Sequence, residues 1–175
     1  MKILAISGST RQASTNTAML RSIASVAPSD VQINVFQGIS ELPIFSPDLE
    51  AIALPRTVQN FANLVHESDG VIIASPEYVK SIPGGLKNVI DWLVSREEIV
   101  TKPISLVHAS HRGDDMLQQL RLVLSTVSEL FSKDIFLRFN LLNQTPCEIL
   151  DFLELPQHRL AIDEYLQIFS EYCRK

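Results

Sequence analysis

The stretch Ser7-Gly8-Ser9-Thr10-Arg11-Gln12-Ala13-Ser14-Thr15-Asn16 lies between two segments of different periodicity. Residues 3–6 are all apolar, which predicts a buried strand, whereas residues 17–24 carry apolar side chains at helical spacing. The stretch is therefore expected to connect a strand to a helix. Its hydroxyls, amide and arginine, together with free N–H groups at a helix N-terminus, suit a bound phosphate. The alternative is an ordinary turn whose Ser and Thr residues only cap the helix.

Two better-known phosphate loops do not occur in this stretch. It lacks the Gly-x-x-x-x-Gly-Lys-Ser/Thr pattern of nucleoside-triphosphate loops. It also lacks the Gly-x-Gly-x-x-Gly pattern that binds dinucleotides. Gly8 nevertheless allows a tight turn and a close approach of the backbone to a ligand.

Composition and charge limit the classes of protein. The chain has 175 residues, 46% of them apolar and 20% charged, which predicts one globular domain over residues 1–175 rather than a disordered chain. A net charge of −5 gives no basic footprint for nucleic acid and argues against binding to anionic membranes. The apolar N-terminal stretch stops at Ser7, which is too short for a secretory signal, so we expect a soluble, cytoplasmic protein.

The cysteines and histidines form no recognisable motif. Cys147 and Cys173 are far apart in the sequence and are expected to be reduced structural thiols. The four histidines have no metal-ligand spacing relative to them, so no metal site is predicted. His108, at the end of an apolar run, is expected to be a buried histidine with its hydrogen bonds satisfied.

Strand and helix patterns alternate along the rest of the chain. Further strands are expected at 31–36, 71–75, 104–110 and 133–139, and helices at 55–67, 86–95, 116–131 and 157–172. Residues 37–54 form a long connection, and residues 140–155 are expected to be irregular. This order predicts a three-layer α/β fold with a five-stranded parallel sheet. The loops after the first, third and fourth strands then meet at the carboxyl edge, where such sheets bind ligands.

Two segments resemble the signatures of one known family. Residues 8–16 resemble the Gly-Ser-x-Arg-x-x-Ser-x-Asn signature of the NADPH-dependent FMN reductases, and residues 76–92 resemble their second signature. The segment Leu42-Pro43-Ile44-Phe45 is similar to the family's Leu-Pro segment. The resemblance covers residues 1–140 and implies a flavodoxin-like fold, non-covalently bound FMN, and NADPH or NADH as the electron donor. The family includes flavin, quinone, azo-dye and chromate reductases.

The resemblance also implies which residues contact the cofactor and the substrate. The FMN phosphate would be held by Ser9, Arg11, Ser14, Thr15 and Asn16. The isoalloxazine ring would lie against the two later loops. Of these, residues 109–113 would lie near the ring and the ribityl chain. Contacts with the cofactor from these loops would come from Pro76, Glu77, Tyr78, Val79, Ser81, Ser110 and His111. Apart from the resemblance, the loop positions of Tyr78 and Arg112 at the ligand edge make them candidates for substrate contact. The alternatives are contact with a partner subunit for Tyr78 and a merely solvated side chain for Arg112. No catalytic side chain is required, because the flavin N5 atom carries the hydride chemistry.

The sequence departs from the family in two places. Val79 stands where Asn is common, and the loop after the fourth strand, usually rich in glycine, reads Ser110-His111-Arg112-Gly113-Asp114-Asp115. In a protein of this family, such side chains would be expected either to narrow the space above the flavin or to alter the nicotinamide site. The expected function is NAD(P)H-dependent reduction of a flavin, quinone or related acceptor by a ping-pong route. The alternatives are an FMN-binding electron carrier or redox sensor without efficient turnover, and an interaction module that has lost the cofactor.

The helix after the second signature is rich in apolar residues. Its segment contains Ile82, Leu86, Val89, Ile90, Trp92 and Leu93, more apolar surface than one helix face against a sheet requires. With the family's usual assembly, this predicts a homodimer or a tetramer in which Tyr78 lies close to the partner. Trp92 is expected in the core or at a subunit interface, and Lys87, Asn88 and Asp91 at surface and packing positions.

Overall fold

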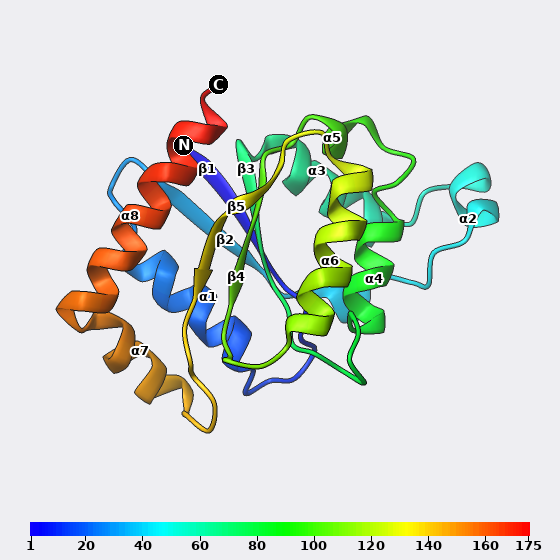
Figure 1. Ribbon diagram of the computed structural model, residues 1–175. Coiled ribbons are helices and arrows are strands. Elements are labelled where there is room, and N and C mark those ends of the chain that lie inside the picture. The colour runs from blue at the N-terminus through cyan, green and yellow to red at the C-terminus, as the bar shows by residue number, and fades with distance from the viewer.

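A five-stranded parallel sheet forms the centre of the computed structural model, which describes residues 1–175 (Figure 1). Its strands are β1 (Lys2–Ser7), β2 (Gln32–Phe36), β3 (Gly70–Ala74), β4 (Ile104–His108) and β5 (Phe131–Arg138). They are ordered β2-β1-β3-β4-β5, with every neighbouring pair parallel. This is the flavodoxin-like strand order, so the predicted fold is confirmed.

Helices cover both faces of the sheet. One face carries α1 (Thr15–Ser25), α7 (Pro146–Glu154) and α8 (Pro156–Cys173). The other carries α3 (Arg56–Glu67), α4 (Gly84–Asp91), α5 (Glu97–Val100) and α6 (Asp114–Val127). None of these helices is both long enough and apolar enough to cross a membrane.

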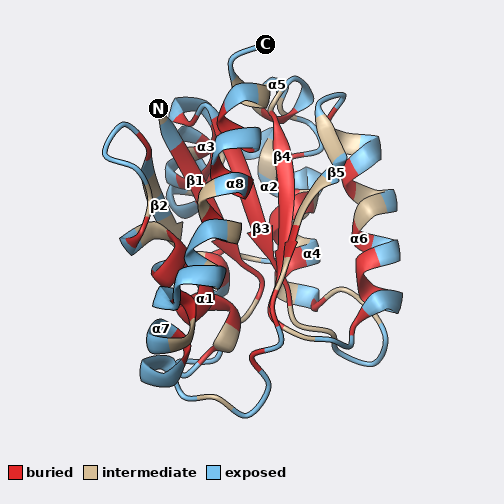
Figure 2. Cartoon of the chain, turned by 60° about the vertical axis from the view of Figure 1, so that its left-hand side comes forward, coloured by how far each residue is buried: buried red, intermediate tan, exposed pale blue.

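The core consists of two apolar clusters separated by the sheet. Alternate residues of a strand point to opposite faces. Ile3 and Ala5 accordingly pack with α1, α7 and α8, whereas Leu4 and Ile6 pack with α3, α4 and α6. Strands β3 and β4 are buried along their whole length, as Figure 2 shows. This burial explains why β3 is a continuous apolar run and why β4 is apolar except at Ser105 and His108.

The prediction that residues 140–155 are irregular is wrong, because α7 lies within them. Thr145 and Glu148 form a capping box at its start, and Pro146 occupies the first turn, where its missing N–H costs nothing. Ile149 and Leu153 are buried against α1 and the sheet. The capping box, the proline in the first turn and the helical spacing of Ile149 and Leu153 are all readable in the sequence, so this helix could have been predicted.

The long connection 37–54 contains a 3₁₀ turn (Gly38–Glu41) and α2 (Pro47–Ile52), which projects from the body of the molecule (Figure 1). The Leu-Pro segment before α2 is fixed to α4. The carbonyl oxygen of Pro43 accepts from Trp92 Nε1 at 2.7 Å and from Asn88 Nδ2 at 2.9 Å, and Phe45 N donates to Asn88 Oδ1 at 2.7 Å. Two residues of the second signature, Asn88 and Trp92, therefore hold the Leu-Pro segment in place.

The sequence predicted more apolar surface on this helix segment than packing within one chain would cover, and this prediction is wrong. Leu86, Val89, Ile90, Trp92 and Leu93 are all buried within one chain. Trp92 is a core residue, and Lys87 pairs with Asp91 on the exposed side of α4. The apolar pattern of this segment therefore gives no argument for a subunit interface.

Candidate functional site

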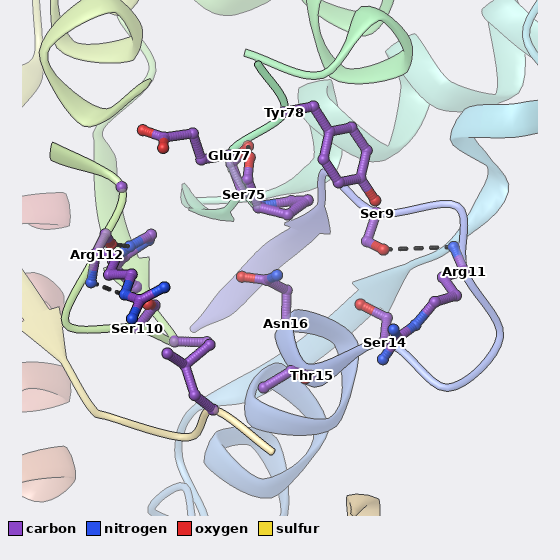
Figure 3. A pocket seen from close by; sticks show the side chains of 15 residues that line it. Ser9, Arg11, Ser14, Thr15, Asn16, Ser75, Glu77, Tyr78, Ser110 and Arg112 are labelled. Carbon is purple, nitrogen blue, oxygen red and sulfur yellow. Dashed lines mark hydrogen bonds between the residues drawn. The ribbon is translucent and has the colours of Figure 1, made fainter. Parts of the chain in front are cut away.

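A cavity of about 340 Å³ opens at the carboxyl edge of the sheet, between the loops that follow β1, β3 and β4 (Figure 3). The first loop contributes Ser9, Arg11, Ser14, Thr15 and Asn16. The second contributes Ser75, Pro76, Glu77 and Tyr78, and the β4 end and third loop contribute His108, Ala109, Ser110, Arg112 and Gly113. Leu142 completes the lining from the segment after β5.

The first loop is organised by its own polar groups. Ser14 Oγ accepts from Thr17 N at 3.2 Å and so caps α1. Arg11 Nε donates to the Ala13 carbonyl oxygen at 3.0 Å, and Ser9 Oγ accepts from Arg11 N at 3.3 Å. These internal hydrogen bonds define the shape of the loop, and its residues Ser9 and Ser14 line the cavity.

Gly8 lets this loop approach the second loop closely. A Cβ atom at this position would lie 2.9 Å from Leu86 Cδ2 and 3.1 Å from Ser75 Oγ. A side chain there would force Leu86 to move and would crowd Ser75 and the Ala74 carbonyl oxygen, which lies 3.3 Å away. The glycine of the signature thus sets the spacing between two walls of the cavity.

The start of α1 leaves hydrogen-bonding groups free at the cavity. The backbone N–H groups of Thr15 and Asn16 donate to no protein acceptor. Asn16 is only 7% exposed, and its Oδ1 atom has no hydrogen-bond partner. Figure 3 shows its amide directed into the space between the three loops. A buried polar atom without a partner is costly, so this end of the cavity is suited to a polar ligand.

The second loop contains a tight turn next to the cavity. Tyr78 and Ser81 exchange backbone hydrogen bonds of 3.1 and 3.0 Å. Between them Val79 and Lys80 have φ values of 51° and 58°, the left-handed region that Asn adopts far more readily than the β-branched Val. The departure from the family at Val79 therefore costs local strain.

The structure brings together the predicted site residues except Val79, Ser81 and His111. Val79 stands at the tip of the turn, 98% exposed. Ser81 Oγ donates to Gln119 Oε1 at 2.7 Å, and His111 Nδ1 lies 3.0 Å from Asn140 Oδ1. None of the three lines the cavity. His111 and Asn140 instead connect the third loop to the segment after β5.

Three lining residues lie outside the predicted set: Ser75, His108 and Leu142. Ser75 follows β3 and His108 ends β4. Their positions at the carboxyl ends of strands could therefore have identified them as lining residues from the sequence. Leu142 belongs to a segment with no recognisable motif, and only the fold brings it to the cavity.

His108 is buried beneath the third loop. Its Nε2 atom donates to the carbonyl oxygen of Arg112 at 2.5 Å, since a carbonyl can only accept. Its Nδ1 atom has no partner, so the predicted satisfied histidine is only half satisfied. Burial lowers the pKa of His108 below its ordinary value, which keeps the ring neutral at neutral pH.

The lining residues fit FMN. The free N–H groups at the start of α1 and the hydroxyls of the first loop suit a phosphate. The unpaired Asn16 Oδ1 can only accept a hydrogen bond, so it suits a hydroxyl or N–H group of the ligand. The cavity also has apolar surface from Tyr78, Ala109 and Leu142, which suits a planar ring. Its volume lies within the ordinary range for small-molecule sites.

Comparison with known proteins agrees with this geometry. The family model "NADPH-dependent FMN reductase" matches residues 1–136. The chain is 34% identical over 116 residues to a quinone reductase of Escherichia coli K12, covering 65% of this chain and 61% of that protein. It is 35% identical over 112 residues to an NAD(P)H-dependent FMN reductase of Pseudomonas aeruginosa, covering 63% of this chain and 60% of that protein. The matches thus span less than two thirds of these relatives.

A solved structure resembles the whole chain. The flavoenzyme NAD(P)H:(acceptor) oxidoreductase FerB from Paracoccus denitrificans superposes with a TM-score of 0.75, covering 98% of both chains at 20% identity. At that identity the likeness concerns the fold. The two signatures, the flavodoxin-like sheet and the family match over residues 1–136 lead to one conclusion. The chain belongs to the NADPH-dependent FMN reductase family.

Proposed function

We propose that the chain is an oxidoreductase that binds FMN non-covalently in the cavity and uses NADPH or NADH to reduce a flavin, a quinone or a related small acceptor. The observation that carries the proposal is the free backbone N–H groups of Thr15 and Asn16 beside the hydroxyl-rich first loop, at the sheet edge where this fold binds ligands. The relatives named quinone reductase and FMN reductase support the same reaction class.

Each wall of the cavity has a separate task in this proposal. Ser9, Arg11, Ser14, Thr15 and Asn16 bind the phosphate through hydroxyl, amide and backbone N–H groups. Pro76, Glu77 and Tyr78 orient the ring on one side, and the third loop does so on the other. Bound FMN would supply the redox chemistry, taking a hydride from the nicotinamide and passing electrons to the acceptor.

The donor and the acceptor would use the cavity in turn. Both must reach the same face of a planar ring within one cavity, which Tyr78 and Arg112 line from two different loops. One substrate therefore leaves before the next enters, a ping-pong order. The protein orients each of them and needs no nucleophile of its own.

The proposal is tested with the FMN-loaded protein under anaerobic conditions. NADPH or NADH should bleach the flavin absorption, and a benzoquinone added afterwards should restore it, both within the time of a turnover. If the flavin binds but neither nucleotide bleaches it, the protein is an electron carrier or redox sensor. If no flavin binds, the chain is an interaction module and the proposal fails.

Arg112 is proposed to attract the nucleotide. It lies exposed at the rim of the cavity, and its guanidinium makes no hydrogen bond within the protein. Arg112→Ala should raise KM for NADPH about tenfold and for NADH less, with kcat nearly unchanged, because a charge-assisted bond to phosphate is worth about 1.5–3 kcal/mol. Steady-state kinetics with both nucleotides measure this split.

Lys133→Ala is the matched control, since it removes one exposed cation from β5 outside the cavity. Faster reduction of Arg112→Ala by both donors would mean instead that Arg112 blocks the ring. Kinetics identical to the unchanged protein would exclude both roles.

We further propose a homo-oligomer, a dimer or tetramer, in the cytoplasm. The support is the exposed apolar pair Tyr78 and Val79 beside the cavity, which is 51% and 98% exposed, together with the family membership. Light scattering at micromolar concentration should give a mass of at least twice that of one chain. A monomeric mass would contradict this proposal without affecting the one on FMN.

A further inference from the structure

The third loop is held by one side chain that no signature contains. Arg138 is the last residue of β5 and lies beyond the family match at residues 1–136. Its Nε donates to the Ser110 carbonyl oxygen at 2.6 Å, and its Nη2 donates to the Arg112 carbonyl oxygen at 3.0 Å. Its Nη1 pairs with Asp114 Oδ1 at 2.8 Å. One guanidinium thus connects Ser110, Arg112 and Asp114, the first residue of α6.

A second donor reaches the same carbonyl from the interior. The Arg112 carbonyl oxygen also accepts from His108 Nε2, and the His108 ring is 2% exposed. Gly113, the next residue, has a φ of 98° and packs so closely that a Cβ atom would lie 2.8 Å from His108 Nε2. The peptide after Arg112 is therefore fixed by two donors and by a glycine-only conformation.

This fixed peptide determines what the loop offers to the cavity. A trans peptide points its C=O and N–H in opposite directions. Because the Arg112 carbonyl is directed to His108 and Arg138, the Gly113 N–H is directed away from them, and it donates to no protein acceptor. Gly113 and Arg112 both line the cavity. A change in this peptide would alter the cavity wall without altering any residue of the signatures.

We propose that Arg138 is a positioning residue, which holds the third loop in the conformation that lines the cavity and thereby sets the donor groups on that wall. The part of this proposal that concerns ligand affinity rests on the proposed binding of FMN. Arg suits the task because its planar fork can reach three acceptors at once, whereas the ammonium of Lys is a single point charge.

The test compares Arg138→Met, Arg138→Lys and Arg121→Met by amide hydrogen exchange without flavin and by FMN titration. Two amides report on the loop: Arg112 N, which donates to Ser110 Oγ at 2.9 Å, and Leu117 N, which donates to the Gly113 carbonyl oxygen at 3.0 Å. In Arg138→Met both should exchange at least tenfold faster, and FMN affinity should fall at least tenfold. Arg138→Lys should lie between this variant and the unchanged protein.

Arg121→Met is the matched control. Arg121 lies over the Phe136 ring of β5, with 4.8 Å to the ring centroid, whereas the hydrogen bonds to the third loop come from Arg138. The loss of Arg121 should leave both readouts unchanged. If Arg138→Met does not fold, Arg138→Lys decides by the same two readouts.

Unchanged exchange at Arg112 and Leu117 in the folded variants would overturn the positioning role. If the two amides exchange faster but FMN affinity is unchanged, the claim that Arg138 shapes the ligand-binding wall of the cavity is overturned. If the unchanged protein binds no FMN, the proposed function fails, while the exchange rates still decide whether Arg138 fixes the loop.

Discussion

Replacing Trp92 with alanine is expected to lower the free energy of unfolding by about 3–5 kcal/mol, the usual cost of removing a large buried aromatic side chain. Trp92 is fully buried, and Phe45 packs edge-on against its ring with centroids 5.1 Å apart. Its Nε1–H also holds the Pro43 carbonyl oxygen. The variant should therefore lose core packing and one of the three hydrogen bonds that hold the Leu-Pro segment, while the two bonds to Asn88 remain. Urea unfolding followed by circular dichroism measures the change.

Trp92→Phe separates the two losses. Phenylalanine keeps much of the ring volume but has no N–H donor, and Pro43 keeps its bond to Asn88 Nδ2. This variant should therefore be destabilised by clearly less than Trp92→Ala, because a typical hydrogen bond contributes about 0.5–1.5 kcal/mol. A loss below about 1 kcal/mol for Trp92→Ala would contradict the position assigned to Trp92 in the core.

Gly113→Ala is expected to weaken FMN binding by roughly 30- to 150-fold. A left-handed conformation costs an L-residue about 1–2 kcal/mol. The new Cβ would also lie 2.8 Å from His108 Nε2, so the ring must move off the Arg112 carbonyl, which costs about another 1 kcal/mol. If FMN requires the native loop, these costs of about 2–3 kcal/mol appear in its affinity. Equilibrium titration with FMN measures the loss.

Gly84→Ala is the matched glycine control. A Cβ atom at Gly84 would meet nothing within 4 Å, and its φ is not positive. Alanine there should leave FMN affinity unchanged and can stabilise the fold by about 0.4–1 kcal/mol. Equal FMN affinity in Gly113→Ala and Gly84→Ala would show that the third loop does not contribute to binding.

The sequence predicted the sheet because its strands carry strong signals. Strand β3 is a continuous apolar run and β4 is apolar at three of its five positions, and parallel strands with crossover helices leave few possible arrangements. The first loop could be located for the same reason, since Gly8 and Ser14 stand between a strand and a helix. The sequence therefore predicted the elements that follow from local patterns and the edge of the sheet at which the three loops meet.

Other features depended on contacts between distant residues. The apolar residues of α4 predicted an interface, but nothing in a local pattern shows that Leu86 and Ile90 already have partners in the same chain. Leu142 and Arg138 reach the cavity region only because β5 pairs with β4. The turn at Val79 also directs its side chain away from the cavity, since two successive left-handed residues reverse the chain there.

The most direct test of the account is a titration of the flavin-free protein with FMN and, separately, with riboflavin, followed by quenching of flavin fluorescence. The two ligands share the ring and differ in the phosphate. FMN should bind one molecule per chain and at least about tenfold more tightly than riboflavin, because charge-assisted hydrogen bonds from the first loop reach only the phosphate. Equal affinity for the two ligands, or no saturable binding of FMN, would contradict the account.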